Sequence, residues 1–321
     1  MTHNRLQNKV AGSVFTLPIC IVIAVALWWL PQQAFSVRCL LGLLLCLLTT
    51  YVVMETNGQQ HIIRIRTRMM SCVWLILTAC LSFMHPLGEP IIAAACLCVS
   101  YLLLFRCYQR HRPQAFVFHA FLMLGIGSFC APVMLLMAIP YLFYIAIFLR
   151  SMTKKAFWAG ILGLVLPYWC YAVWCFVTGK IDPLQTFPFM ERLPFSLPLK
   201  VELDGVLYLP FSVQVSIAVV VLLSLVSIVH YLRTNYDDKI RVRMILYIYV
   251  SQTVLLTAFL LLQPTYYQTT MALLVASASP LIAHYFALTG SIMSNIFFVL
   301  SVLLTAGMAT LNLWLTSFSI V

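Results

Sequence analysis

Long apolar runs separated by short basic joints constrain this chain more than any other feature. The runs are about 16 to 26 residues long, which suits α-helices that cross the hydrocarbon core of a bilayer. Hydrophobic residues make up 63% of the chain and charged residues only 8%, whereas soluble domains carry about 25% charge. Inside a bilayer only helices and closed barrels satisfy every backbone polar group. The sequence therefore predicts an all-α, polytopic transmembrane helical bundle.

We expect about 11 spans, counted as apolar runs between charged or Pro-rich joints. The first run, Ala11 to Leu30, is interpreted as a retained helix because no small-residue cleavage site ends it. The remaining runs are Cys39–Met54, Met69–Met84, one ending near Phe105, two limbs within Gln114–Leu149, Ala156–Val177, Phe211–Tyr231, one ending at Gln263, Thr269–Leu288 and one ending near Thr316.

Residues Gln114–Leu149 can form one very long helix or a hairpin broken at Ala131-Pro132, and charge decides between them. With the hairpin, fifteen Lys and Arg side chains lie on the amino-terminal side of the membrane, and four lie on the other side. With one helix the split is eleven to eight. Cytoplasmic loops carry an excess of Lys and Arg. The sequence thus predicts a multi-pass protein of the cell inner membrane, with a cytoplasmic amino terminus and a periplasmic carboxyl terminus.

The net charge of +11 follows from this orientation. Fifteen basic and three acidic residues give +12 on the predicted cytoplasmic face, and four basic and five acidic residues give −1 on the outer face. Such a distribution favours contact with membrane lipids, whose anionic headgroups attract basic joints. It argues against nucleic acid as a partner, since no basic patch has the extent that phosphate contacts require.

Polar and ligating groups are few inside the apolar runs. The eleven cysteines lie almost entirely within them and form no CxxC pair, so we interpret them as packing residues and expect neither a metal nor another cofactor. His119 and His284 lie near the cytoplasmic ends of their spans, where each is expected to hydrogen-bond to a neighbour. Gln252, Asn295 and Asn312 are expected to bond between helices. No Asp, Glu, Lys or Arg lies at mid-span, which argues against ion-coupled transport.

The segment from Thr178 to Pro210 is the one long break in the apolar pattern. It holds four of the eight acidic side chains and five prolines. Each Pro removes a backbone donor and clashes with the preceding helical turn, which rules out a long helix. Phe187, Phe189 and Phe195 give the segment apolar faces. We expect an outer-face loop, residues 178–210, that lies on the membrane or caps the bundle within a single integral membrane domain, residues 1–321.

Carboxylates of the predicted outer face are the candidate catalytic groups. Glu89 lies in a turn between Pro86 and Pro90, and Asp182 directly follows a span and precedes Pro183. Two carboxylates that face one cleft can act as general base and metal ligand; the alternative is that they only keep the loops solvated. The candidates for binding a substrate are Arg38, Glu191, Arg192, Glu202 and Asp204.

Three stretches carry a resemblance to a known family: GIGSFCAPVMLLMAIPYLFYIAIFLRSMTKKAFWAGILGLVLPYWCYAVWCFVTG, DDKIRVRMILYIYVSQ and LLVASASPLIAHYFA. They resemble an uncharacterised family of Bacteroidetes inner-membrane proteins. That family has no assigned activity, so this resemblance implies the fold and the membrane only.

The order of hairpin, basic joint and LGLVLPYW is also similar, more distantly, to polytopic glycosyltransferases of the GT-C class. Those enzymes use a polyprenyl-phosphate sugar donor and an acidic residue in the first outer loop. The corresponding loop here, Pro31 to Arg38, has no acidic residue. The resemblance therefore implies that Glu89 or Asp182 supplies the carboxylate and that Arg38 binds the donor phosphate.

Three classes of function stay open at this point. The first is a non-catalytic assembly or accessory role in the cell envelope, in which the outer loop contacts a lipid or an envelope protein. The second is a GT-C-like transferase that acts on a polyprenyl-phosphate-linked substrate. Acidic residues that converge on Arg38 would favour this function. The third is a transporter, which a midplane cavity lined by broken helices would favour.

Overall fold

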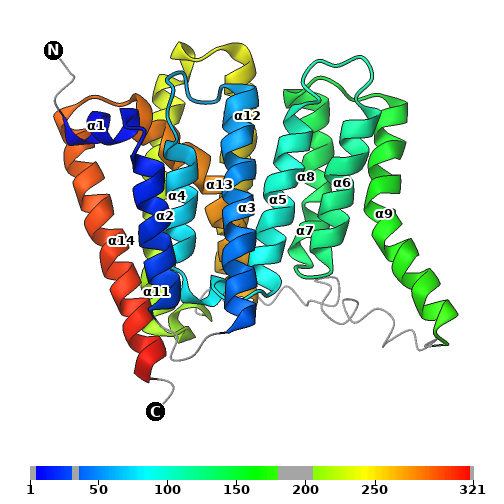
Figure 1. The fold of residues 1–321 in the computed structure, drawn as a ribbon. Helices are drawn as coiled ribbons and strands as arrows, with labels where there is room; N and C mark the ends of the chain where they lie inside the picture. The colour runs from blue at the N-terminus through cyan, green and yellow to red at the C-terminus, as the bar shows by residue number, and fades with distance from the viewer. Residues whose placement is uncertain (1–4, 31–35, 180–204, 319–321) are drawn as a thin grey trace. The chain divides into compact units, whose positions relative to one another are not determined.

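The computed structural model describes residues 5–30, 36–179 and 205–318, with side chains up to residue 313. The chain divides into two compact units, which we call unit 1 (Met1–Ile91 with Glu202–Val321) and unit 2 (Ile92–Val201). Every element among the described residues is helical (Figure 1), so the predicted all-α fold is confirmed. The prediction of a single membrane domain stays a prediction.

Unit 1 contains most of the helices. They are α1 (Leu6–Gly12), α2 (Thr16–Trp29), α3 (Val37–Gln60), α4 (Met69–Ala79), η1 (Ser82–Met84), η4 (Gly205–Tyr208), α11 (Phe211–Thr234), η5 (Asn235–Asp237), α12 (Ile240–Leu262), η6 (Pro264–Tyr266), α13 (Tyr267–Leu288) and α14 (Ile292–Phe318). The next helix, α5 (Glu89–Phe105), begins in unit 1 and continues into unit 2.

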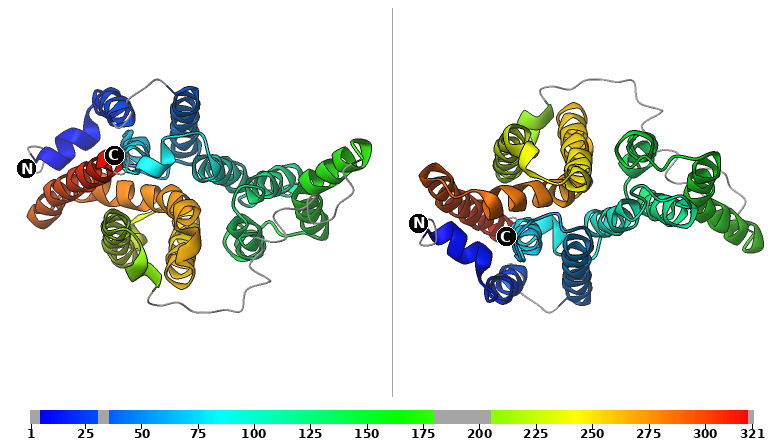
Figure 2. Two further views of the ribbon diagram at one scale, coloured as in Figure 1. Left: turned by 90° about the horizontal axis from the view of Figure 1, so that it is seen from below. Right: turned by 90° about the horizontal axis from the view of Figure 1, so that it is seen from above.

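α13 is the core of unit 1. It packs against α4, α11 and α12, and Figure 2 shows it crossing the middle of this group of helices. Every residue from Thr269 to Ala287 is buried. Small residues recur on this helix at Ala272, Ala276, Ser279 and Ala283, and each is less than 3% exposed. Small side chains let neighbouring helices approach closely, which explains how one helix can be enclosed on all sides.

The first predicted span begins later than expected. α1 and α2 meet at 93°, because Ser13 ends α1 in an extended conformation and its hydroxyl accepts a hydrogen bond from the amide of Phe15 at 3.2 Å. The prediction of one helix from Ala11 to Leu30 is therefore wrong in its first turn. α1 instead lies across one end of unit 1 (Figure 1). Elsewhere α3 continues past the predicted end, whereas α4 stops five residues before Met84.

Unit 2 is built around a helical hairpin. Its elements are α6 (Gln114–Ser128), α7 (Val133–Leu136), α8 (Ala138–Phe143), the π-helical turn η2 (Tyr144–Phe148) and α9 (Lys154–Val177). The amide of Gln109, before the hairpin, donates to the carbonyl of Leu149, the last residue of the hairpin, at 3.0 Å. The two ends therefore meet, and the hairpin broken at Ala131-Pro132 is confirmed.

The packing of α9 on α6 depends on a glycine. A Cβ at Gly163 would collide with the backbone carbonyl of Phe118 on α6, so only glycine allows the two backbones to come this close. The spacing of Ala159 and Gly163 predicts such an approach of a neighbouring helix, and the structure confirms it.

Six described helices are long and apolar enough to cross a membrane, or seven if the bent pair α1–α2 is one span. They are Val37–Gln60, Lys154–Val177, Phe211–Asp237, Ile240–Leu262, Pro264–Leu288 and Ile292–Leu313. Four further apolar helices are shorter: Met69–Ala79, Glu89–Phe105, Gln114–Ser128 and Val133–Phe148. By length and composition the chain is thus a helical membrane protein.

Lys and Arg gather at one end of each unit, which we call its basic end. In unit 1, three contacts bring the basic joints together. They are the Thr67–Ala11 hydrogen bond (2.6 Å), the Arg64–Asp238 ion pair (2.9 Å) and the Arg241–Gln60 hydrogen bond (2.5 Å). The cations at this end are Arg5, Lys9, Arg64, Arg66, Arg68, Arg233, Lys239, Arg241 and Arg243. Arg38 lies at the other end of α3.

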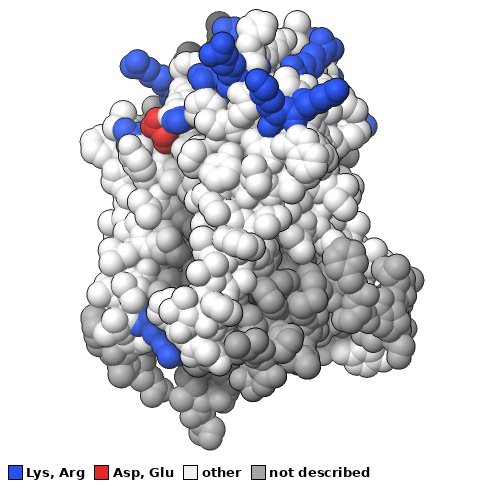
Figure 3. Space-filling view, turned by 90° about the vertical axis from the view of Figure 1, so that its right-hand side faces the viewer, with Lys and Arg blue, Asp and Glu red and all other residues white. Residues whose placement is uncertain are grey.

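The described cations of unit 2 show the same grouping. Arg106, Arg110, Arg112, Arg150, Lys154 and Lys155 all lie on the two joints that the Gln109–Leu149 hydrogen bond connects. On the face that Figure 3 draws, most Lys and Arg side chains lie toward one end, although a blue side chain is also seen toward the other end. The charge asymmetry expected from the sequence is therefore present within each unit.

Candidate functional site

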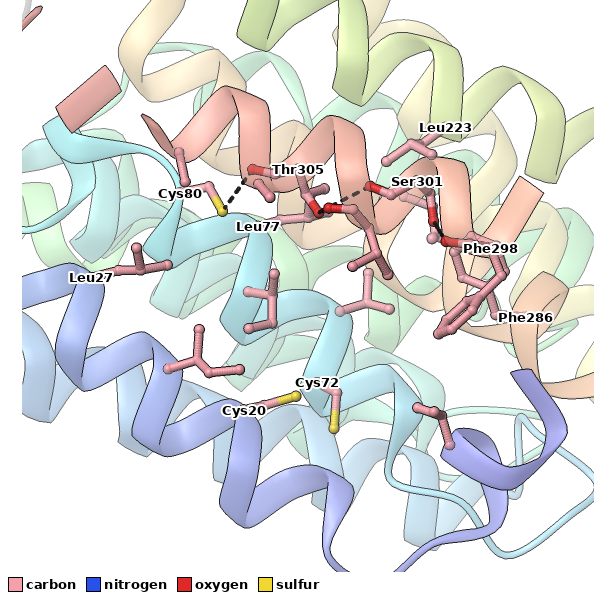
Figure 4. Close-up of a pocket in the computed structure, with 18 of the residues that line it drawn as sticks. Cys20, Leu27, Cys72, Leu77, Cys80, Leu223, Phe286, Phe298, Ser301 and Thr305 are labelled. Atoms are coloured by element: carbon pink, nitrogen blue, oxygen red, sulfur yellow. Dashed lines mark hydrogen bonds between the residues drawn. The ribbon is translucent and has the colours of Figure 1, made fainter. Parts of the chain in front are cut away.

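An apolar cleft lies in unit 1. It has a volume of about 480 Å³ and lies between α2, α4 and α14, with α11 and α13 behind it. Figure 4 draws α4, with Cys72, Leu77 and Cys80, next to α2, with Cys20 and Leu27, and α14, with Ser301 and Thr305, on the other side of α4. We call this cavity the α2–α4–α14 cleft.

The helix α4 is accessible only from the cleft. All residues of α4 are buried except Val73 and Ile76, and both of these line the cleft. The facing residues of α14, such as Val302 and Ala306, are exposed on the other wall. A molecule that touches α4 must therefore enter the cleft.

Polar side chains in the cleft wall are already hydrogen-bonded within the wall. Ser301 donates to the carbonyl of Phe298 at 2.7 Å, and Thr305 to that of Ser301 at 2.9 Å (Figure 4). The remaining bonds are Thr16 to Val10, Thr310 to Gly307 and Cys80 to Thr305. With these donors turned back onto the helices, the surface that faces the cavity is hydrocarbon and sulfur.

Hydrogen bonds hold the helices at both ends of the cleft. At the basic end, the side chain of Gln7 of α1 donates to the carbonyl of Phe286 at 2.6 Å, and the backbone amide of Gln7 donates to the side-chain oxygen of Asn295 at 3.1 Å. At the opposite end, Asn312 of α14 donates to the carbonyl of Cys80 at 2.9 Å and to Ser216 of α11 at 3.0 Å. The predicted interhelical roles of Asn295 and Asn312 are confirmed, and these bonds fix the width of the cleft.

A buried ionic cluster ties the basic end of unit 1 together. The Asp238 side chain is fully buried, with Arg64 Nε 2.9 Å from Oδ1 and His284 Nε2 3.1 Å from Oδ2. The Arg64 contact is an ion pair without the alignment of a hydrogen bond. The Tyr231 ring meets that of His284 edge-on at 5.6 Å, and the Tyr231 hydroxyl donates to the carbonyl of Arg243 at 3.2 Å. These contacts hold the α3–α4 joint, the α11–α12 joint and α13 together.

Arg38 and Glu89 lie on neighbouring segments at the end of unit 1 opposite its basic end. The amide of Leu87 donates to the carbonyl of Arg38 at 2.9 Å, and a Cβ at Gly42 would collide with the carbonyl of His85. The turn before Glu89 is thus pressed against the start of α3. Glu89 is also the first residue of α5, where a negative charge stabilises the helix dipole.

His85 is the buried group of this turn. Its ring stacks on Trp28 with centroids 4.4 Å apart, and its Nε2 lies 2.9 Å from the carbonyl of Ala79. Its Nδ1 is buried without a hydrogen-bond partner among the described residues. Burial lowers the pKa of His85 to about 4, against the weaker effect of the Ala79 carbonyl. The imidazole is therefore neutral at physiological pH.

Five of the predicted site residues lie outside the described residues: Asp182, Glu191, Arg192, Glu202 and Asp204. Of the carboxylates whose convergence on Arg38 would favour the transferase, only Glu89 lies among the described residues, and the backbone bond from Leu87 to Arg38 brings its segment next to that of Arg38. Within the described residues no group of three or more His, Cys, Asp and Glu side chains could hold a metal ion.

Sequence reasoning missed both the cleft and the role of Asp238. From the sequence, Asp237 and Asp238 count alike, as acidic residues of the predicted cytoplasmic face. The structure distinguishes them, because Arg64 and His284 enclose only Asp238. The sequence did contain a signal for the role of Asp238. His284 was expected at the same membrane face and was expected to hydrogen-bond to a neighbour, and its bond to Asp238 confirms this expectation. The cleft has no such signal, since its walls come from helices far apart in sequence.

Comparison with protein-family models, with curated proteins and with solved structures finds no match to this chain. The resemblances noted for the sequence therefore stay predictions.

Proposed function

We propose that the protein is a multi-pass protein of the cell inner membrane that holds a membrane lipid by its hydrocarbon chain in the α2–α4–α14 cleft. Its role in the cell envelope would be an accessory or assembly role. The cleft carries this proposal: its volume of about 480 Å³ falls within the range of about 300–1,000 Å³ for ligand sites. A sugar in it would lose its hydrogen bonds to water without replacement, which costs free energy. A hydrocarbon chain has no such bonds to lose.

The topology that we propose has eleven spans. It adds the α1–α2 pair and the four shorter apolar helices to the six long ones. A short helix can cross where the bilayer thins locally or where neighbouring helices cover its ends. The basic ends would face the cytoplasm, in keeping with the excess of Lys and Arg in cytoplasmic loops. The amino terminus would then be cytoplasmic and the carboxyl terminus periplasmic.

Photo-crosslinking tests whether a lipid chain occupies the cleft. The purified full chain is mixed with a phospholipid that carries a diazirine in mid-chain, irradiated, and digested for mass spectrometry. The informative readout is labelling of α4, because its two accessible residues, Val73 and Ile76, both line the cleft. Label on α4 supports the proposal, whereas label confined to the outer faces of other helices contradicts it.

A matched pair of variants makes this experiment specific. Val302 and Leu303 are neighbours on α14, and their side chains are 51% and 64% exposed, but only Val302 lines the cleft. Val302→Trp should fill the cavity and remove most labelling of α4. Leu303→Trp adds the same bulk on the outside and should leave that labelling unchanged. Equal labelling of α4 in the two variants would exclude the cleft as the lipid site.

A second candidate function is glycosyl transfer from a lipid-linked donor, as in the GT-C enzymes that the sequence resembles. It is favoured by the Leu87–Arg38 hydrogen bond of 2.9 Å, which brings the segments of Glu89 and Arg38 together. Such a transfer requires a carboxylate to deprotonate the acceptor and a cation to bind the donor phosphate. Asp182, outside the described residues, would be the other carboxylate.

Complementation of a deletion strain tests this second candidate. Glu89→Gln and Asp182→Asn remove only charge and keep shape, and Glu55→Gln is the control at the basic end. Loss of the envelope function in Glu89→Gln or Asp182→Asn, at normal protein level and with Glu55→Gln active, supports catalysis. Full complementation by the double variant Glu89→Gln/Asp182→Asn contradicts it.

A further inference from the structure

We propose that the lipid in the α2–α4–α14 cleft carries an anionic phosphate headgroup, which Lys9 and Arg68 hold at the basic end of unit 1. This inference rests on the proposed lipid-binding function and adds to it the class of the ligand. It specifies a phospholipid without a compensating positive charge, with its headgroup at the basic end and its chain in the cleft.

Lys9 and Arg68 lie on two separate segments, each next in sequence to a residue of the cleft wall. Lys9 precedes Val10 and Arg68 precedes Met69, and both Val10 and Met69 line the cavity. The hydroxyl of Thr67 donates to the carbonyl of Ala11 at 2.6 Å, so the segment of Arg68 is bonded directly to the end of α1.

Both cations are available to a ligand. Their side chains are exposed, and no described carboxylate forms an ion pair with either of them. The buried carboxylate of this end, Asp238, is already shared by Arg64 and His284. Lys9 and Arg68 thus add positive charge where an apolar cavity opens. A negative headgroup linked to a hydrocarbon chain is complementary to this combination.

The geometry favours a lipid phosphate over a free phosphate ion. Exposed ion pairs contribute little on their own because water and salt screen them, so two exposed cations would hold a free ion weakly. A lipid whose chain lies in the cleft presents its phosphate to the same cations at a high effective concentration. The acyl chain of the lipid supplies affinity, and its headgroup supplies selectivity.

The test compares two photoreactive lipids with identical diazirine acyl chains, a phosphatidylglycerol and a phosphatidylcholine, on the detergent-solubilised full chain. Variants are Lys9→Gln/Arg68→Gln and, as a control, Arg66→Gln/Lys239→Gln, which removes two exposed cations from the same basic end. Labelling of α4 is measured, and native mass spectrometry gives the mass of whatever is bound. We expect phosphatidylglycerol to label α4 more strongly in the unmodified protein. Each removed cation should reduce that preference about fivefold.

The outcomes separate the two proposals. Loss of the preference in Lys9→Gln/Arg68→Gln, with the preference kept in the control, supports the headgroup site. Equal labelling by both lipids, abolished by Val302→Trp, overturns the headgroup site and leaves lipid binding in place. Labelling that Val302→Trp does not reduce overturns both. A complex with the mass of two chains and no lipid would assign the cleft to a second copy and overturn both as well.

Discussion

Asp238 is a single side chain on which the joints of unit 1 depend. Burying a carboxylate is costly unless partners compensate its charge. Here Arg64 and His284 approach both oxygens, and they come from the α3–α4 joint and from α13. The ion pair therefore fixes which segments lie together at the basic end. The cluster stabilises the fold of unit 1 most when Arg64, Asp238 and His284 are all present.

We expect Asp238→Asn to lower the free energy of unfolding by about 1–3 kcal/mol. Breaking a buried ion pair costs about 3–5 kcal/mol, but the Arg64 side chain is 45% exposed, so it can turn toward water and recover part of that loss. Asp237→Asn is the matched control, since Asp237 is exposed. Unfolding by SDS titration in mixed micelles measures both. Equal midpoints for the two variants would show that the cluster does not stabilise the fold.

His85 should make stability depend on pH. Its pKa in the folded protein is about 4 because burial disfavours the charged ring, whereas an unfolded His has a pKa of about 6.5. Between these values the unfolded chain binds more protons, so stability is complete above pH 6.5 and falls as the pH drops toward 4. The loss from this one group is at most about 3 kcal/mol.

The variant His85→Gln isolates this contribution. Gln cannot titrate, so thermal unfolding in detergent should change less between pH 6.5 and pH 4 than in the unmodified protein. His111 is exposed, so His111→Gln should keep the full pH dependence. An unaltered pH dependence in His85→Gln would mean that other groups account for the acid sensitivity.

At the scale of helices, the close contact of α6 and α9 depends on the missing side chain of Gly163. A Cβ there meets a backbone carbonyl of Phe118, whereas a Cβ at Gly307 of α14 meets nothing within 4 Å. Both glycines lie inside long helices. The same substitution should therefore have opposite effects at the two positions.

We expect Gly163→Ala to destabilise the protein by about 1–3 kcal/mol, because a backbone carbonyl can yield only if the two helices separate. Gly307→Ala should be neutral or stabilising by up to about 1 kcal/mol, since Ala favours helix over Gly. SDS-induced unfolding measures both variants. A stabilising Gly163→Ala would show that α6 and α9 do not approach as closely as the structure has it.

The helices themselves were predictable, and their exceptions have local causes. Apolar runs and the positive-inside rule located the hairpin and the helix α13, because both are patterns within continuous sequence. The bend between α1 and α2 was missed, since one capping bond at Ser13 interrupts an unbroken apolar run. Of the predicted site, Arg38 and Glu89 do lie on neighbouring segments. The cleft could not be predicted, because it depends on how α2, α4 and α14 diverge in space.

Across the whole molecule, the distribution of charge is the property that relates the fold to a membrane. Within unit 1, α12 separates Lys239 at the basic end from the turn around Thr265 at the other end. Its 23 residues span about 34 Å, slightly more than the hydrocarbon core of about 30 Å. An orientation assay on these two positions therefore tests the proposed topology directly.

Cysteine labelling in intact cells makes this test. Lys239 and Thr265 are both exposed, so Lys239→Cys and Thr265→Cys should fold normally, and the unmodified protein gives the background of its own cysteines. With a cytoplasmic basic end, a membrane-impermeant maleimide should label Thr265→Cys in intact cells and label Lys239→Cys only after permeabilisation. Lys154→Cys reports on unit 2 and should behave like Lys239→Cys, since its basic end follows the same rule. Labelling of Lys239→Cys in intact cells would invert unit 1 and remove the proposed cytoplasmic amino terminus. Opposite behaviour of Lys154→Cys and Lys239→Cys would instead refute the eleven-span count, because the two basic ends would then lie on different sides of the membrane.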